Sequence, residues 1–364
     1  MSAVIDSGPA NNADNVLYVT ITLCQPGSTT NCATIPYIQV DTGSTGLRVL
    51  ASVLPTTWAL PQQHASDNNP LVECFTYADN TFNWGPIVTA DITVGGKTAG
   101  STAMQLIGSS SFPNIPAGCG PSNMADDTVA TLGANGIIGV SPFIQDCGST
   151  CATTAQQGYY YSCTGSVCNP IAVPLTAQVP NPITKFATDN NGLIVELPTA
   201  PAAGEATLTG TLVFGVNTET NNQLTTQTIV PVDDAGYITA EFNGVSYPDS
   251  FIDTGSNGWF FTDSSITQCA NSNFMGFYCP ASPVALSATI STATGLTGAI
   301  HFTIASAQTL ADGNPSFSVF PELGGTNSDA QSFDFGLPFY VGRSVYHVIE
   351  GETVAGTMGP FLAF

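Results

Sequence analysis

The residues best suited to chemistry in this chain are two aspartates, Asp41 and Asp253, each of which begins the sequence Asp-Thr-Gly-Ser. A short apolar run typical of a buried strand precedes each copy, and the glycine permits the tight turn that follows. A carboxylate at the end of a buried strand is costly unless neighbouring groups satisfy it. Two such carboxylates, 253 − 41 = 212 positions apart, predict a duplicated lobe with one carboxylate from each half.

Paired carboxylates support a specific kind of acid–base chemistry. When they are held about 3 Å apart they cannot both ionise readily, so the pair shares one proton. One carboxylate can then accept a proton from water while the other donates a proton to a carbonyl oxygen. We expect the threonine hydroxyls to hold the two turns together and the serine hydroxyls to donate to the outer carboxylate oxygens. The candidate catalytic residues are Asp41 and Asp253, and the residues expected to support them are Thr42, Gly43, Ser44, Thr254, Gly255 and Ser256.

An ordinary turn is the alternative interpretation, because Asp-Thr-Gly is common turn chemistry. A single copy would favour that reading. The second copy, which again follows an apolar strand, favours paired carboxylates instead.

The motifs resemble those of pepsin-like aspartic proteases. They resemble still more closely a bacterial secreted family of unknown function related to those enzymes, because Gly-Leu-Arg-Val continues the first motif and Phe-Gly-Leu-Pro-Phe-Tyr-Val-Gly-Arg occupies residues 335–343. The resemblance covers nearly the whole chain. It implies a mainly β, two-lobed pepsin-like acid protease fold with a central cleft and an inter-lobe sheet. It also implies an aspartic endopeptidase that works at acid pH, needs no cofactor and binds no metal.

The chain has 364 residues, a length that favours about two domains. Gly, Pro, Ser, Thr and Asn recur at short spacing, and this pattern is typical of a mainly β protein. Residues 211–216 resemble the strand by which pepsin-like chains cross between lobes. We therefore predict an N-terminal lobe at residues 1–215 and a C-terminal lobe at 216–364. Gly139 follows two apolar residues and matches a second signature of the first lobe, and we expect Gly342 to be its counterpart.

In pepsin-like enzymes a β-hairpin flap, with a tyrosine near its tip, covers the cleft. The corresponding hairpin here would span residues 75–92, with residues 79–81 and 84–86 near its bend. Tyr77 and Trp84 are the candidate substrate-binding residues of this flap. Arg48 stands where pepsins usually have a tryptophan that contacts the flap tyrosine. Arg48 either bonds to the flap or approaches the two aspartates, or it forms a structural ion pair with one of the many acids.

The charge balance is extreme, with 26 acidic residues, four Lys and Arg, and a net charge of −22. Nucleic-acid binding requires a basic footprint, which this composition does not provide. Attraction to anionic membranes is excluded for the same reason. Tolerance of acid is one interpretation, because lowering the pH neutralises carboxylates without leaving a large positive charge. Solubility through negative charge is the other.

Ten cysteines, an even number, invite pairing by their local spacing. Cys24 can pair with Cys32 and Cys269 with Cys279, while Cys147, Cys151, Cys163 and Cys168 form a cluster. Cys74 and Cys119 remain for a longer loop. A metal site is the weaker alternative, because the three histidines are scattered and no Cys-x-x-Cys spacing occurs. Disulfides indicate an oxidising compartment, so we expect a secreted or periplasmic protein.

No apolar run approaches the about 20 residues of a membrane span. We expect a monomer whose partner is a peptide or protein substrate, with no nucleic acid and no membrane span. The alternative function is a catalytically weak or inactive pepsin-like shell that acts as a binding protein or inhibitor. Two intact Asp-Thr-Gly motifs favour the enzyme.

Overall fold

The computed structural model describes residues 1–121 and 124–364, and these residues pack as two compact units. The carboxylate unit, which holds both candidate aspartates, consists of Met1–Tyr18, Val40–Gly43 and Asn191–Phe364. The hairpin unit consists of Val19–Gln39 and Ser44–Asn190. Strands dominate both units, which confirms the expected mainly β class. The lobe boundary near residue 216 stays a prediction.

The hairpin unit is built on one sheet with the order β10-β9-β5-β6-β7-β4-β8-β3-β2, and β6 also pairs with β2. Strands β2 (Leu17–Cys24) and β3 (Cys32–Asp41) each have one end in the carboxylate unit. The other strands are β4 (Thr45–Leu50), β5 (Leu71–Thr76), β6 (Phe82–Val94), β7 (Lys97–Ile107), β8 (Gly136–Val140), β9 (Tyr160–Thr164) and β10 (Val167–Pro170). The helices are short: α1 (Val129–Leu132), α2 (Ser149–Thr153) and the 3-10 turns Ala51–Val53, Ala117–Cys119, Leu175–Ala177 and Pro182–Lys185.

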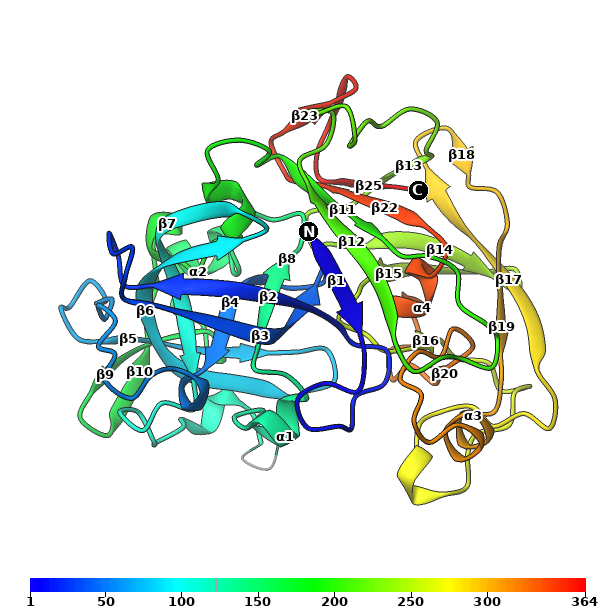
Figure 1. Cartoon of the computed structure of the whole chain (residues 1–364), viewed down its shortest axis with the longest axis horizontal. Coiled ribbons are helices and arrows are strands. Elements are labelled where there is room, and N and C mark those ends of the chain that lie inside the picture. The colour runs from blue at the N-terminus through cyan, green and yellow to red at the C-terminus, as the bar shows by residue number, and fades with distance from the viewer. Residues whose placement is uncertain (122–123) are drawn as a thin grey trace. The chain divides into compact units, whose positions relative to one another are not determined.

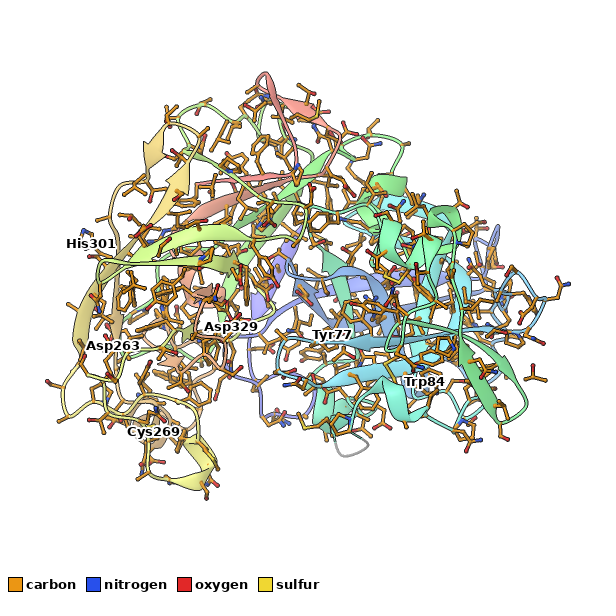
Figure 2. The ribbon with its side chains drawn as sticks, turned by 180° about the vertical axis from the view of Figure 1, so that it is seen from behind. Tyr77, Trp84, Asp263, Cys269, His301 and Asp329 are labelled. Atoms are coloured by element: carbon orange, nitrogen blue, oxygen red, sulfur yellow. A yellow bond between two sulfur atoms is a disulfide. The ribbon has the colours of Figure 1, made fainter. Side chains whose placement is uncertain are left out.

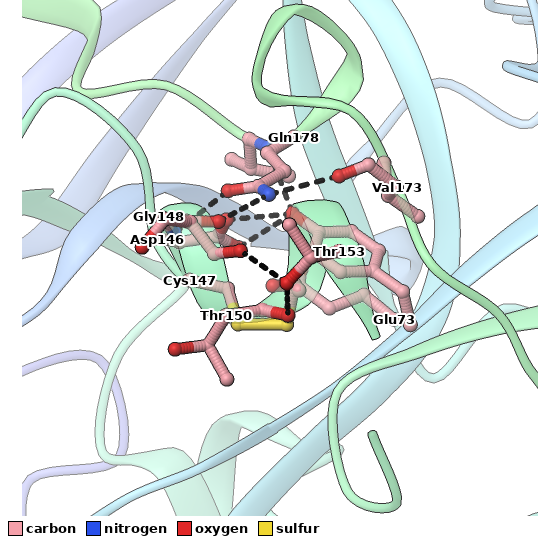
Figure 3. Close-up of a disulfide and its surroundings, with 12 residues drawn as sticks. Glu73, Asp146, Cys147, Gly148, Thr150, Thr153, Val173 and Gln178 are labelled. Atoms are coloured by element: carbon pink, nitrogen blue, oxygen red, sulfur yellow. Dashed lines mark hydrogen bonds between the residues drawn. A yellow bond between two sulfur atoms is a disulfide. The ribbon is translucent and has the colours of Figure 1, made fainter. Parts of the chain in front are cut away.

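Disulfides cross-link the hairpin unit. The bridges are Cys24–Cys32, Cys74–Cys119, Cys147–Cys151 and Cys163–Cys168, and a fifth, Cys269–Cys279, lies in the carboxylate unit. The three pairings expected from the sequence are therefore present, and the pairing within the four-cysteine cluster, which the sequence left open, is resolved as Cys147–Cys151 and Cys163–Cys168. The Gln178 side chain closes the segment around Cys147–Cys151, because it accepts from the Gly148 N–H at 2.8 Å and donates to the Gly148 and Val173 carbonyls at 2.8 and 2.9 Å (Figure 3).

The carboxylate unit contains strands in the order β1-β12-β11-β22-β25-β13, and β1 lies beside β12 at the N-terminus (Figure 1). A second sheet has the order β18-β17-β14-β15-β21-β16-β20, with β19 paired to β17, and β23 pairs with β24. The strands are β1 (Ser2–Ile5), β11 (Gly192–Glu196), β12 (Leu208–Phe214), β13 (Ile229–Pro231), β14 (Ile238–Phe242), β15 (Val245–Ile252), β16 (Trp259–Phe260), β17 (Val284–Thr292), β18 (Gly295–Leu296), β19 (Ile300–Ile304), β20 (Gly324–Gly325), β21 (Asp334–Phe335), β22 (Ser344–Val348), β23 (Thr353–Val354), β24 (Thr357–Met358) and β25 (Phe361–Ala363). The helices are α3 (Ala307–Gly313), α4 (Leu337–Tyr340) and the 3-10 turn Ser272–Phe274.

Local sequence explains how β15 reaches the second motif. Asn243 and Gly244 join β14 to β15 with φ values of 51° and 75°, which are the left-handed values that a two-residue hairpin turn requires. Aromatic rings fill the core behind the hairpin: Phe333 stacks on Phe261 at 4.8 Å and on Phe335 at 4.4 Å between ring centroids. This core fixes β21 beside the end of β15.

No helix among the described residues is long and apolar enough to cross a membrane.

Candidate active site

Two strands deliver the candidate carboxylates within the carboxylate unit. Strand β3 ends at Asp41, and β15 ends one residue before Asp253. Strand β15 pairs in parallel with β21, and the Asp253 N–H donates to the Phe335 carbonyl at 3.0 Å. Both side chains are nearly buried, with 5% of Asp41 and 8% of Asp253 exposed.

The two motifs face each other in a reciprocal way. A Cβ added to Gly43 would lie 2.7 Å from the Asp253 Cγ, and a Cβ added to Gly255 would lie 2.7 Å from the Asp41 Oδ1. Real Cβ atoms essentially never come so close to other heavy atoms. The missing side chain of each glycine therefore provides the space that the carboxyl group of the other motif occupies. The approach explains why both motifs carry glycine at this position.

Backbone N–H groups hold each carboxylate in place. The Gly43 N–H donates to Asp41 Oδ1 at 2.8 Å, and the Gly255 N–H donates to Asp253 Oδ1 at 2.7 Å. The Ser256 hydroxyl donates to the other oxygen of Asp253 at 3.3 Å. Ser44 lies in the hairpin unit, where its carbonyl accepts from the Ser141 N–H at 2.9 Å.

The two threonines bind each other's backbone. The Thr42 N–H donates to Thr254 Oγ1 at 3.2 Å, and the Thr254 N–H donates to Thr42 Oγ1 at 3.0 Å. The Thr254 hydroxyl then donates to the Val40 carbonyl at 2.7 Å. All of these groups are buried. The exchange fixes the separation of the two aspartates, each of which directly precedes one of the threonines.

The electrostatics of the site favour a retained proton. Burial raises the pKa of Asp253 well above its usual value, and repulsion by Asp41 and by Asp334 raises it further. The hydrogen bond from the Gly255 N–H opposes the rise. The site therefore matches a carboxylate pair that holds a proton well above the pH at which a free aspartate would lose it.

A third carboxyl group, Asp334, was not predicted from the sequence. It lies on β21 opposite Phe251 and is 5% exposed, and its Oδ1 has no hydrogen-bond partner among the described residues. Burial raises its pKa well above the usual value, a hydrogen bond from Ser256 lowers it and repulsion by Asp41 raises it. The residue sits in an apolar strand, where an aspartate is unusual, and that contrast was the available signal.

The prediction that Gly342 is the second-lobe counterpart of Gly139 was wrong. A Cβ on Gly139 would lie 2.7 Å from the Ser44 backbone carbon, and a Cβ on Gly336, rather than on Gly342, would lie 2.6 Å from the Ser256 carbonyl oxygen. Gly342 instead occupies a turn with φ +77° near Thr199. Two apolar residues precede Gly139, whereas Asp334 and Phe335 precede Gly336, so the apolar pattern did not identify Gly336.

The flap candidates occupy different parts of the hairpin, which has its turn at residues 77–81 (Figure 2). Tyr77 begins the turn and donates its hydroxyl to Asn83 Oδ1 at 2.5 Å. Trp84 does not lie near the bend as predicted: it pairs with Cys74 inside β6, is 4% exposed and packs against Tyr161. Its indole N–H donates to the Phe112 carbonyl at 2.9 Å, so Trp84 is a core residue.

Arg48 is fully buried in the hairpin unit, and of the roles expected for it the structure shows the structural ion pair. It forms ion pairs with Glu73 at 2.8 Å and Asp146 at 3.2 Å, and its guanidinium lies 3.6 Å from the centroid of the Phe75 ring. Burial alone would lower the pKa of Arg48, but the charges of Glu73, Tyr77 and Asp146 raise it. The cluster anchors β5 at the base of the hairpin.

A pocket of about 160 Å³ opens beside the second motif. The N-terminal segment forms one wall, because Asn15 donates to the carbonyls of Asn257 and Phe320, both at 2.8 Å. The lining is mostly apolar with a carboxylate at one side: Asn12, Asp14, Asn257, Asn273, Phe274, Phe277, Ala307, Leu310, Ala311, Phe320 and Leu323. Among the described residues no group of His, Cys, Asp and Glu side chains is arranged to hold a metal ion.

Comparison with known proteins supports the fold. A family model described as "Protein of unknown function (DUF3443)" matches residues 1–364. Among solved structures, an aspartic proteinase from Irpex lacteus is similar, with a TM-score of 0.53 and 15% sequence identity over 100% of this chain and 96% of that one. A search of curated proteins finds no match. The similarity confirms the predicted pepsin-like fold.

Proposed function

The chain belongs to the DUF3443 family of unknown function, and from the geometry of its carboxylate pair we propose that it is an aspartic endopeptidase. The observation that carries the proposal is the reciprocal approach of Gly43 to Asp253 and of Gly255 to Asp41. A fold without catalysis would have no need to bury two facing carboxyl groups, since burying charge is costly. The pepsin-like fold of the chain is consistent with this activity.

The reaction needs only water and the two carboxyl groups. The water oxygen attacks the carbonyl carbon of the peptide bond while one carboxylate takes a proton from the water. The other carboxyl group gives its proton to the carbonyl oxygen, and a tetrahedral intermediate forms. When the intermediate collapses, one carboxyl group gives a proton to the nitrogen and the C–N bond breaks, while the other carboxylate takes a proton from a hydroxyl of the intermediate. The amine leaves, and the pair again holds one shared proton. Asp41 and Asp253 would act together in this cycle.

The supporting residues would act by holding this geometry. The N–H groups of Gly43 and Gly255 stabilise the charged form of each carboxylate, and the threonine exchange fixes their separation. The pocket beside Asn257 would receive one side chain of the peptide substrate. A flap role for Tyr77 remains part of the proposal, because Tyr77 lies at the turn of the β5–β6 hairpin.

The proposed site of action lies outside the cytoplasm, since the ten cysteines form five disulfides and an oxidising compartment preserves such bonds. A secreted bacterial protein is the proposal that fits best.

The test is cleavage of an unfolded protein substrate from pH 3 to 7, with and without a transition-state-mimicking inhibitor of aspartic proteases. The proposal predicts cleavage at acid pH that the inhibitor abolishes. Tight binding of substrate without any cleavage over this range would contradict the proposal and favour the binding-protein alternative.

A further inference from the structure

The hydrogen bonds of the two motif threonines are not symmetric. On one side the Thr254 hydroxyl donates directly to the Val40 carbonyl, which precedes Asp41. On the other side the Thr42 hydroxyl lies 2.9 Å from the Tyr340 hydroxyl. The Tyr340 hydroxyl in turn lies 3.4 Å from the Ile252 carbonyl, which precedes Asp253. The Tyr340 hydroxyl therefore lies between Thr42 and the Ile252 carbonyl, whereas Thr254 bonds directly to the Val40 carbonyl.

His347 contacts the Tyr340 hydroxyl and packs against its ring. Its Nε2 lies 3.1 Å from the Tyr340 hydroxyl, and the two rings stack with an interplanar angle of 3°. Tyr340 on α4 is fully buried and His347 on β22 is 1% exposed. Burial lowers the pKa of His347 to about 3, so the imidazole is neutral from pH 4 upward.

Counting donors and acceptors fixes the direction of each bond. The His347 Nδ1 has no partner among the described residues, and a buried N–H without an acceptor is rarer than an acceptor without a donor. The proton therefore belongs on Nε2, which donates to the Tyr340 oxygen. Thr42 Oγ1 accepts from the Thr254 N–H, and among the described residues its own proton has no acceptor other than the Tyr340 oxygen, so Thr42 donates to Tyr340. The Tyr340 proton then goes to the Ile252 carbonyl, and each donor has an acceptor.

We propose that Tyr340, oriented by His347, is a positioning residue for the carboxylate pair, because its hydroxyl links Thr42, next to Asp41, to the Ile252 carbonyl, next to Asp253. The inference rests on the proposed peptidase function. It acts through the backbone at the ends of β3 and β15, and not through contact with substrate. Loss of the Tyr340 hydroxyl would leave the Thr42 O–H, the His347 N–H and the Ile252 carbonyl without their shared partner.

The first test compares Tyr340→Phe with Tyr346→Phe. Tyr346 lies on β22 and donates its hydroxyl to the Gln223 carbonyl at 3.1 Å, so it controls for loss of a tyrosine hydroxyl outside the site. Tyr340→Phe should lower kcat about 10- to 100-fold with little change in KM, because misplacement of reacting groups acts on the chemical step. His347→Gln, which keeps an N–H donor, should retain more activity than His347→Leu. Equal kcat values for Tyr340→Phe and Tyr346→Phe would overturn the proposal.

The second test does not depend on activity. Nitrogen-15 NMR of the histidine side chains should show His347 neutral with its proton on Nε2 from pH 7 to 4, and Tyr340→Phe should shift that signal. A proton on Nδ1, or a signal that Tyr340→Phe leaves unchanged, would overturn the hydrogen-bond relay. If the wild type cleaves no substrate, the peptidase proposal fails, while this measurement still decides whether the relay exists.

Discussion

The Gly43 Cα faces the Asp253 carboxyl group so closely that a methyl group on it would lie 2.7 Å from the Asp253 Cγ. Gly255 stands in the same relation to Asp41. Each motif therefore supplies both a carboxylate and the space for the carboxylate of the other motif. This mutual dependence explains why the whole motif, and not the aspartate alone, occurs twice.

Gly43→Ala should abolish most activity and destabilise the protein by about 1–3 kcal/mol, because the added methyl group must displace a buried carboxyl group. The measurements are initial cleavage rates and the free energy of unfolding in urea. Gly298→Ala is the matched control, since a Cβ there meets nothing within 4 Å. If both variants behaved like the wild type, the close approach of the two motifs would be contradicted.

Asp334→Asn should move the alkaline limb of the kcat/KM–pH profile to lower pH. The reason is the sign of the interaction: an ionised Asp334 raises the pKa of Asp253, so its removal lowers that pKa and the pair loses its shared proton earlier. Activity at the acid end should persist, because Asp334 is protonated there. A limb that stayed in place, or moved to higher pH, would show that Asp334 does not influence the pair.

The facing of the two aspartates could be predicted from the sequence because the feature is local: four residues after an apolar strand, twice. The catalytic and supporting roles of these residues stay predictions. The sequence did not reveal Asp334, Tyr340 or His347, because these residues reach the site only through the pairing of β21 with β15 and the packing of α4 against β22. Gly336 was missed because the neighbouring Asp334 disrupts the apolar pattern.

Trp84 was misplaced for a related reason. The prediction placed residues 84–86 near the bend together with 79–81, whereas the turn lies at 77–81 and β6 continues unbroken from Phe82 to Val94. Pro86 is compatible with that strand at its pairing position with Val72. For Arg48, by contrast, the structure selects the ion-pair alternative among those that the sequence left open, and the scarcity of cations beside many acids had suggested that alternative.

Arg48→Met should destabilise the protein by about 3–5 kcal/mol at pH 7, because it leaves Glu73 and Asp146 buried without their cation. The loss should be smaller at pH 4. Burial and the charge of Glu73 raise the pKa of Asp146, so this carboxyl group takes up a proton more readily than usual as the pH falls.

Lys97→Met serves as the control for Arg48→Met. The ion pair of Lys97 with Asp189 at 2.5 Å is partly exposed, with 26% of the Lys97 side chain accessible, so its loss should cost about 0–1 kcal/mol. Urea unfolding at both pH values gives the comparison. A similar small loss in both variants would mean that the Arg48 cluster is not the anchor of the hairpin.

Asp14→Asn should weaken cleavage of peptides that carry Lys or Arg at one position near the scissile bond, by about tenfold in kcat/KM. Asp14 provides the one carboxylate in a pocket otherwise lined by asparagines and apolar residues, and burial alone perturbs its pKa. Burial raises the pKa of Asp14, so the preference should be measured at the upper end of the active pH range. A cleavage profile that is the same for both proteins would remove Asp14 from substrate selection.

The most direct test of the central claim is the cleavage rate of Asp41→Asn and Asp253→Asn beside Asp234→Asn, an exposed control, from pH 3 to 7. Because the two carboxyl groups act as one unit, each of the first two variants should lose nearly all activity at every pH, while Asp234→Asn matches the wild type. If either Asp41→Asn or Asp253→Asn retained the wild-type rate, the paired-carboxylate account would be contradicted.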